Sequence, residues 1–199
     1  HCLLTLVAAG LTFGQQAVPS LRLSMVSEGF SDPTQIVSPR DDSDRMLVVE
    51  QAGTIRAFSL ETGAIYPEPF LDIRAKVFQR PVACCDEEGL LGLAFPLDHG
   101  PKDHCFVFYV DPDRNIVISR FDVDPAALRA DPASEKVLQT VPHPLRNHFS
   151  GTMSFNPADG LLWLGIGDGS QADAVEESQN PDSVYGKVLR FNPYDPEAK

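Results

Sequence analysis

The stretch Asn147–Ser170, NHFSGTMSFNPADGLLWLGIGDGS, decides how this chain is interpreted. It contains two apolar runs, Thr152–Phe155 and Leu161–Ile166, separated by a proline and by an Asp-Gly turn signal. Each run suits one buried strand, so the stretch predicts an antiparallel pair. His148 stands just before the first run and Asp168 just after the second. Because the start of one antiparallel strand and the end of the next share a sheet edge, the two side chains are expected to meet.

A histidine beside a carboxylate can act as a general base. The imidazole titrates near neutrality, and the carboxylate fixes its tautomer and favours its protonated form. In a structural interpretation, His148 is instead a capping or core histidine and Asp168 makes an Asx turn. The catalytic interpretation gains weight from nearby glycines, which let a backbone approach a ligand closely: Gly151, Gly165, Gly167 and Gly169.

The composition is that of a soluble globular protein, with 43% hydrophobic and 22% charged residues among 199. The formal net charge of −12 is spread along the chain and argues against binding to nucleic acid or to anionic membranes. The many prolines at turn-like positions, and the lack of a long helical period, favour an all-β fold.

The chain begins with an apolar run at residues 3–13, LLTLVAAGLTF, which is too short to span a bilayer. We interpret residues 1–17 as the remnant of a secretory signal peptide, although a buried N-terminal strand is the alternative. The signal interpretation predicts a secreted protein, extracellular or periplasmic, in which disulfides are allowed. Cys2 would leave with the signal, and one of the adjacent residues Cys84 and Cys85 could then pair with Cys105.

Three similar units, with prolines and turns at matching positions, follow a predicted strand at residues 18–25. Each unit has an apolar run, then Pro39, Pro96 or Pro157, then a turn and two further strands. A fourth strand is predicted after the first two units, at residues 68–73 and 136–141. The expected strands of the three units are residues 35–38, 46–50 and 54–58; 90–95, 105–110 and 116–121; and 152–155, 161–166 and 187–191.

A repeated unit of four antiparallel strands is typical of a β-propeller blade, with a β-sandwich as the alternative. Three units do not close a ring, so residues 18–199 are expected to be the N-terminal portion of a longer propeller, truncated at its C-terminus. The polar segment 169–185 is interpreted as a solvated acidic loop. Glu87 and Glu88 precede the first strand of the second unit, as His148 precedes that of the third. They are therefore expected to face the same opening, unless they are ordinary surface charges.

Several motifs together resemble the glucose/sorbosone dehydrogenase family, which includes soluble quinoprotein aldose sugar dehydrogenases and the related domain of hedgehog-interacting-protein-like proteins. The similarity runs from about Phe30 to the end of the chain. The motifs are EGLLGLAFP (residues 88–96), ISRFDVDP with RADPASEKVL (118–138), NHFSG (147–151), LLWLGIGDG (161–169) and GKVLRFNP (186–193).

The resemblance implies a six-bladed propeller that holds pyrroloquinoline quinone on its axis, with calcium against the quinone and a sugar above it. It implies that His148 is the general base for the C1 hydroxyl of the sugar and that Asp168 orients this base. It also implies substrate contacts from Glu87, Asn147 and Asp173. Glu87 replaces a glutamine that is frequent in active members, and the cofactor contacts in the family come from later blades.

Two functions from different classes follow. The first is an exported quinoprotein sugar dehydrogenase, oxidising an aldose at C1 with hydride transfer to the quinone; the His148–Asp168 pair favours it. The second is a non-catalytic extracellular propeller of the hedgehog-interacting type with a protein partner; the cysteine pair Cys84-Cys85 favours it.

Overall fold

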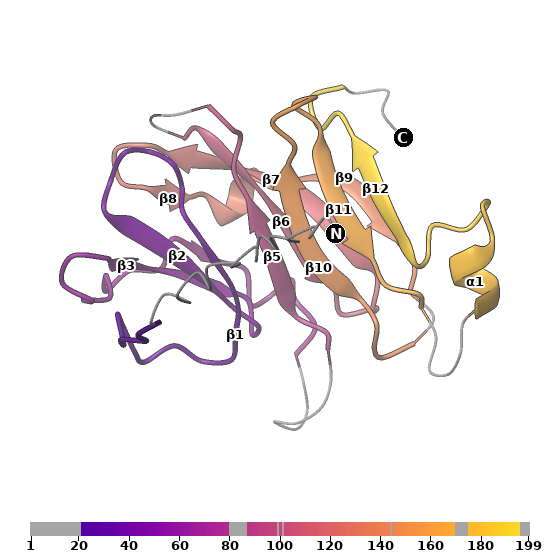
Figure 1. Ribbon diagram of the computed structural model, residues 1–199, viewed down its shortest axis with the longest axis horizontal. Helices are drawn as coiled ribbons and strands as arrows, with labels where there is room; N and C mark the ends of the chain where they lie inside the picture. The colour runs from indigo at the N-terminus through magenta and orange to yellow at the C-terminus, as the bar shows by residue number, and fades with distance from the viewer. Residues whose placement is uncertain are drawn as a thin grey trace, which may run out of the picture.

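The computed structural model describes residues 21–79, 87–98, 100, 102–143, 145–169 and 175–195. Its strands form three antiparallel sheets that follow one another in chain order and lie side by side (Figure 1). The predicted all-β architecture of four-stranded antiparallel units is therefore confirmed for the first two units. We call the three sheets blades 1, 2 and 3.

Blade 1 contains β1 (Pro33–Val37), β2 (Arg45–Glu50), β3 (Thr54–Ser59) and the short β4 (Leu71–Asp72), paired in that order. Blade 2 contains β5 (Leu90–Ala94), β6 (His104–Val110), β7 (Ile116–Asp124) and β9 (Lys136–Val141); β8 (Arg129–Ala130) pairs with the far end of β7. Blade 3 contains β10 (Ser150–Phe155), β11 (Leu162–Ile166) and β12 (Lys187–Phe191).

The first strands of the blades contact one another, which gives the three sheets a propeller-like arrangement. Thr34 of β1 donates a hydrogen bond to the carbonyl of Leu90 on β5, at 3.1 Å. β5 and β10 approach so closely that a Cβ on Gly92 would lie 2.0 Å from the carbonyl oxygen of Gly151. A larger residue than glycine at position 92 would therefore push blades 2 and 3 apart.

Two apolar clusters fill the spaces between the blades. The first joins blade 1 to blade 2 and includes the fully buried Ile55, Phe70 and Phe121. The second joins blade 2 to blade 3 and includes Phe106, whose ring centroid lies 5.3 Å from that of Phe155. Because every blade buries apolar side chains against its neighbour, the three sheets form one packed body.

Three expectations about individual elements are corrected. Residues 21–25 form no strand; the side chains of Leu21 and Leu23 are 93% and 99% exposed, because no described strand lies beside them. The expected strand at residues 68–73 is reduced to β4. The segment expected to be an irregular loop contains the short helix α1 (Val175–Gln179), and a 3-10 turn (Pro132–Ser134) precedes β9.

Among the described residues, no helix is long and apolar enough to cross a membrane. Cys105 lies buried in β6 and forms no disulfide with another described residue. Burial raises the pKa of its thiol. Cys84 and Cys85 lie outside the described residues, so the predicted pairing stays a prediction.

Candidate functional site

His148 and Asp168 lie at the same edge of blade 3. β10 begins at Ser150 and β11 ends at Ile166, and these two residues are paired in the register. The residues just outside the strands therefore meet: Nδ1 of His148 lies 2.6 Å from Oδ1 of Asp168. The juxtaposition expected from antiparallel pairing is present, and it leaves the imidazole 41% exposed.

The backbone around His148 takes conformations that are unfavourable for ordinary residues. His148 has φ +62° and Ser150 has φ +78°, in the left-handed region. A Cβ on Gly167 would lie 1.4 Å from the carbonyl oxygen of His148, so this position accepts only glycine. Strained residues of this kind persist only where their surroundings hold them, and they cluster at functional sites.

Glu87 reaches His148 from the neighbouring blade. Its Oε2 accepts a hydrogen bond from the backbone N–H of His148 at 2.5 Å. Glu87 therefore lies beside His148, and its contact is with the backbone. A contact between Glu87 and a substrate stays a prediction.

Glu88 does not face the opening, and it is not a surface charge. Its side chain is fully buried, and its Oε1 accepts a hydrogen bond from Nε of Arg114 at 2.9 Å. The guanidinium of Arg114 lies 4.5 Å above the ring of Phe78. Glu88 therefore anchors the segment before β5, and this anchor holds its neighbour Glu87 near blade 3.

The other predicted contacts are less defined. Asn147 is partly buried, and its Oδ1 is buried without a hydrogen-bond partner among the described residues. Asp173 lies outside the described residues. The proposed roles of these two residues stay predictions.

Two aromatic residues that contact the neighbours of this pair, Phe149 and Gly169, were not identified from the sequence. His143 is 7% exposed, and its ring stacks on Phe149 with the centroids 3.9 Å apart. Tyr185 meets His143 edge to face, and its ring covers Gly169. Desolvation, and secondarily the charge of Glu177, raise the pKa of Tyr185. Its hydroxyl therefore stays protonated and donates to the carbonyl of Pro142. The only feature of the sequence that could have identified these two residues is that they are aromatic. Aromatic residues usually indicate a position in the hydrophobic core.

The arrangement suits proton abstraction. Asp168 holds Nδ1, and Nε2 of His148 has no partner among the described residues, so it is available at the exposed side of the ring. Positive charge that develops on the ring is stabilised by the carboxylate. This is the chemistry of a general base.

The described residues do not by themselves suit a calcium ion or a carboxylated quinone. No group of three or more His, Cys, Asp or Glu residues within them could hold a metal ion. Among the described residues, the ionisable side chains bonded to His148 are Asp168 and Glu87, which would repel the carboxylates of such a quinone. Cofactor binding would therefore need cationic groups from elsewhere.

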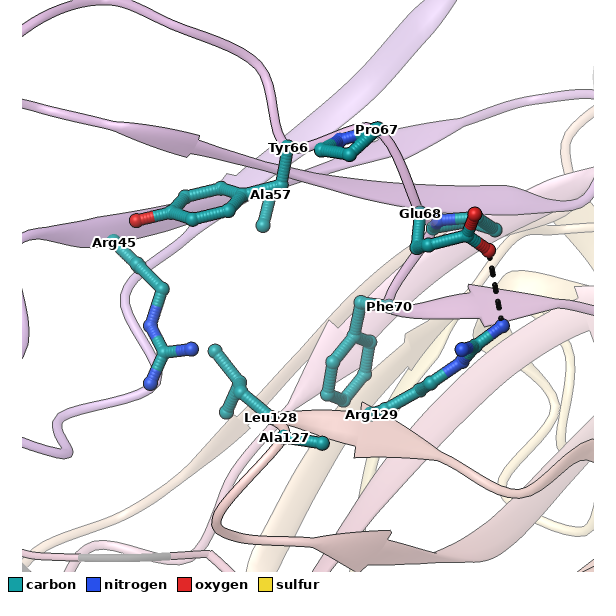
Figure 2. A pocket seen from close by; sticks show the side chains of 10 residues that line it. Arg45, Ala57, Tyr66, Pro67, Glu68, Phe70, Ala127, Leu128 and Arg129 are labelled. Carbon is teal, nitrogen blue, oxygen red and sulfur yellow. Dashed lines mark hydrogen bonds and ion pairs between the residues drawn. The ribbon is translucent and has the colours of Figure 1, made fainter.

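Two pockets of the described residues lie away from this pair. One of about 250 Å³ lies between blades 1 and 2. Figure 2 shows the ion pair of Glu68 and Arg129 at one side of it and Arg45 at the other. Another, of about 450 Å³, lies between β9 and the outer strands of blade 3. Neither is lined by His148, Asp168 or Glu87.

This fold and site define a propeller-type domain with a histidine–carboxylate pair at one edge of its third blade. The model of the Glucose / Sorbosone dehydrogenase family matches residues 30–197. The chain belongs to this family.

The similar proteins fall into two groups. Hedgehog-interacting protein of Mus musculus is 30% identical over 178 residues, which are 84% of this chain and 25% of that protein. The PQQ-bound aldose sugar dehydrogenase of Streptomyces coelicolor has a TM-score of 0.66 at 21% identity, over 86% of this chain and 47% of that one. The apo-form of the soluble aldose sugar dehydrogenase of Escherichia coli has a TM-score of 0.64 at 18% identity, over 85% and 46%.

The chain therefore spans about half of the solved structures and about a quarter of the hedgehog-interacting relatives. At such identities the likeness to the solved enzymes establishes the fold alone.

Proposed function

We propose that this chain is the part of an exported quinoprotein sugar dehydrogenase that carries the general base. The whole protein would oxidise an aldose at C1, with hydride transfer to pyrroloquinoline quinone. The observation that carries the proposal is the contact of 2.6 Å between Nδ1 of His148 and Oδ1 of Asp168, with Nε2 on the exposed side of the ring.

In this reaction the sugar loses a proton from its C1 hydroxyl and a hydride from C1, and becomes a lactone. His148 accepts the proton at Nε2, which gives the hydroxyl alkoxide character and makes loss of the hydride easier. Asp168 stabilises the imidazolium that results and keeps Nε2 directed outward. Quinone and calcium would be held by residues outside those described, and the redox chemistry is the cofactor's.

The test is aldose oxidation by the full-length protein, loaded with quinone and calcium, with His148→Ala. We expect kcat to fall by about 10²- to 10⁴-fold, because a positioned base contributes about this much. His104→Ala is the matched control: His104 also contacts an aspartate, Asp103, but its Nε2 is bonded to Tyr194. His104 lies at the other end of blade 2 from Glu87, because β5 and β6 are antiparallel. Turnover unchanged by His148→Ala, or lowered equally by both, would contradict the proposal.

The second candidate is a non-catalytic extracellular binding domain. It is favoured by the 30% identity to Hedgehog-interacting protein and by the adjacent residues Cys84 and Cys85, which suit an oxidising compartment. Its test is binding of the full-length protein to an immobilised Hedgehog signalling domain, measured beside sugar oxidation. Binding without oxidation supports this candidate, whereas oxidation without binding supports the enzyme.

A further inference from the structure

The backbone of His148 is held by contacts on two sides. On one side, its carbonyl packs against Gly167 so closely that no Cβ fits. On the other, its N–H donates to the carboxylate of Glu87 at 2.5 Å. Because a non-glycine residue at φ +62° is unstable by itself, these contacts keep the residue in its conformation. The same conformation directs the imidazole toward Asp168.

Glu87 is itself supported by blades 1 and 2. Its neighbour Glu88 is fully buried and bonded to Arg114. The side chain of Gln51, from blade 1, donates to the carbonyl of Glu88 at 2.8 Å. The carbonyl of Gln51 in turn accepts from the N–H of Leu90 at 2.8 Å. The segment before β5 is thus held by several hydrogen bonds, and these bonds also hold the backbone that carries Glu87.

We propose that Glu87 is a positioning residue for His148: its carboxylate, supplied by blade 2, holds the backbone of His148 so that the imidazole of blade 3 faces Asp168. A carboxylate suits this role because a charged acceptor bonds an N–H more strongly than a neutral one. The role in catalysis rests on the proposed function, whereas the effect on the backbone of His148 does not.

The direct test measures exchange of the His148 amide proton with solvent. Labelling the full-length protein with ¹⁵N-histidine restricts the amide spectrum to its histidines, five of which lie in this sequence. In Glu87→Ala we expect this proton to exchange about tenfold to a hundredfold faster, because its acceptor is lost. Glu87→Gln keeps an acceptor oxygen and should stay within about threefold to tenfold of the original protein.

Glu68→Ala is the matched control, since it removes an exposed carboxylate of blade 1 that pairs with Arg129, away from His148. It should leave exchange at His148 unchanged. Unchanged exchange in Glu87→Ala would overturn the proposal, as would equal acceleration in Glu68→Ala.

Kinetics of the quinone-loaded protein separate positioning from substrate binding. Positioning predicts that Glu87→Ala lowers kcat about tenfold or more while KM changes less than about twofold, and that Glu87→Gln restores most of kcat. A raised KM with unchanged kcat would show that Glu87 contacts the sugar, and would overturn the positioning role. Accelerated exchange in Glu87→Ala, without sugar oxidation by any form of the protein, would support the backbone contact and refute the proposed enzyme.

Discussion

The imidazole of His148 depends on contacts from separate parts of the chain. Asp168 follows β11, Gly167 precedes Asp168, and Glu87 precedes β5 in another blade. The three contacts act differently, because the aspartate orients the ring, the glycine leaves room for the backbone, and the glutamate holds the N–H. Substitution of each of these three residues should therefore have a different measurable effect.

Asp168→Asn should lower kcat for aldose oxidation by about 10²- to 10⁴-fold while the fold is kept. The amide has nearly the shape of the carboxylate, but it neither stabilises the imidazolium nor secures the tautomer. The measurement is steady-state oxidation by the quinone-loaded protein, with circular dichroism as the check on folding. A kcat within about twofold of the original would contradict the orienting role.

Gly167→Ala should disrupt the site, because its Cβ would lie 1.4 Å from the carbonyl oxygen of His148. We expect a loss of about 3 kcal/mol in the free energy of unfolding. Gly160→Ala is the control: Gly160 has φ +68°, but nothing lies within 4 Å of the added Cβ. It should cost only about 1 kcal/mol. Urea denaturation measures both, and equal losses would show that the close approach is unimportant.

Part of the site could be predicted at this scale and part could not. The meeting of His148 and Asp168 follows from antiparallel pairing alone, which is a short-range rule. The bond from His148 to Glu87, and the burial of Glu88, depend on how two blades pack, which no local pattern encodes. Nothing in the sequence distinguishes His143 from the other histidines, because its stacking on Phe149 depends on the three-dimensional structure.

At the scale of elements, the strands were predictable wherever apolar runs lay between proline or glycine turns. The predicted residues of β2, β3, β6, β7 and β11 agree with the observed strands to within a few residues at the ends, and β9 and β12 agree fully. The prediction failed at residues 21–25, where an alternating pattern has no described partner strand. It also missed β8, because only its pairing with β7 makes it a strand.

A partly buried polar network around Glu135 joins the segment before β9 to blade 1. The carboxylate accepts from Lys76 at 2.6 Å, from the hydroxyl of Tyr109 at 2.8 Å and from Ser119 at 2.9 Å. Desolvation would raise the pKa of Glu135, but these hydrogen bonds together outweigh it and lower the pKa below the ordinary glutamate value. Burial raises the pKa of Tyr109, so its hydroxyl remains a donor.

This network should make stability depend on pH. Because the pKa of Glu135 is lowered on folding, its contribution is fully present above the ordinary glutamate pKa of about 4.3, and it is lost as the pH falls through the lowered value. Glu135→Gln removes this titration. The difference in unfolding free energy between the original and Glu135→Gln should therefore shrink below about pH 4. Curves that stay parallel down to acid pH would contradict this account.

At the scale of the molecule, the apolar clusters between the blades should make them unfold together. Phe106 is fully buried between blades 2 and 3. Phe106→Ala should lower the free energy of unfolding by about 3–5 kcal/mol. Trp163 in β11, the single tryptophan of this sequence, reports on blade 3 through its fluorescence, and circular dichroism reports on all strands. The two signals should change at the same urea concentration in both proteins. Separate midpoints would show that the blades unfold independently.

If His148 is the base for the C1 hydroxyl of an aldose, a crystal structure of the full-length protein with quinone and a bound aldose should show the two groups in contact. The measurement is the distance from Nε2 of His148 to the C1 hydroxyl oxygen. We expect about 2.6–3.2 Å, with Asp168 still bonded to Nδ1. A sugar bound with its C1 hydroxyl directed at another group, or with His148 turned away from Asp168, would contradict it.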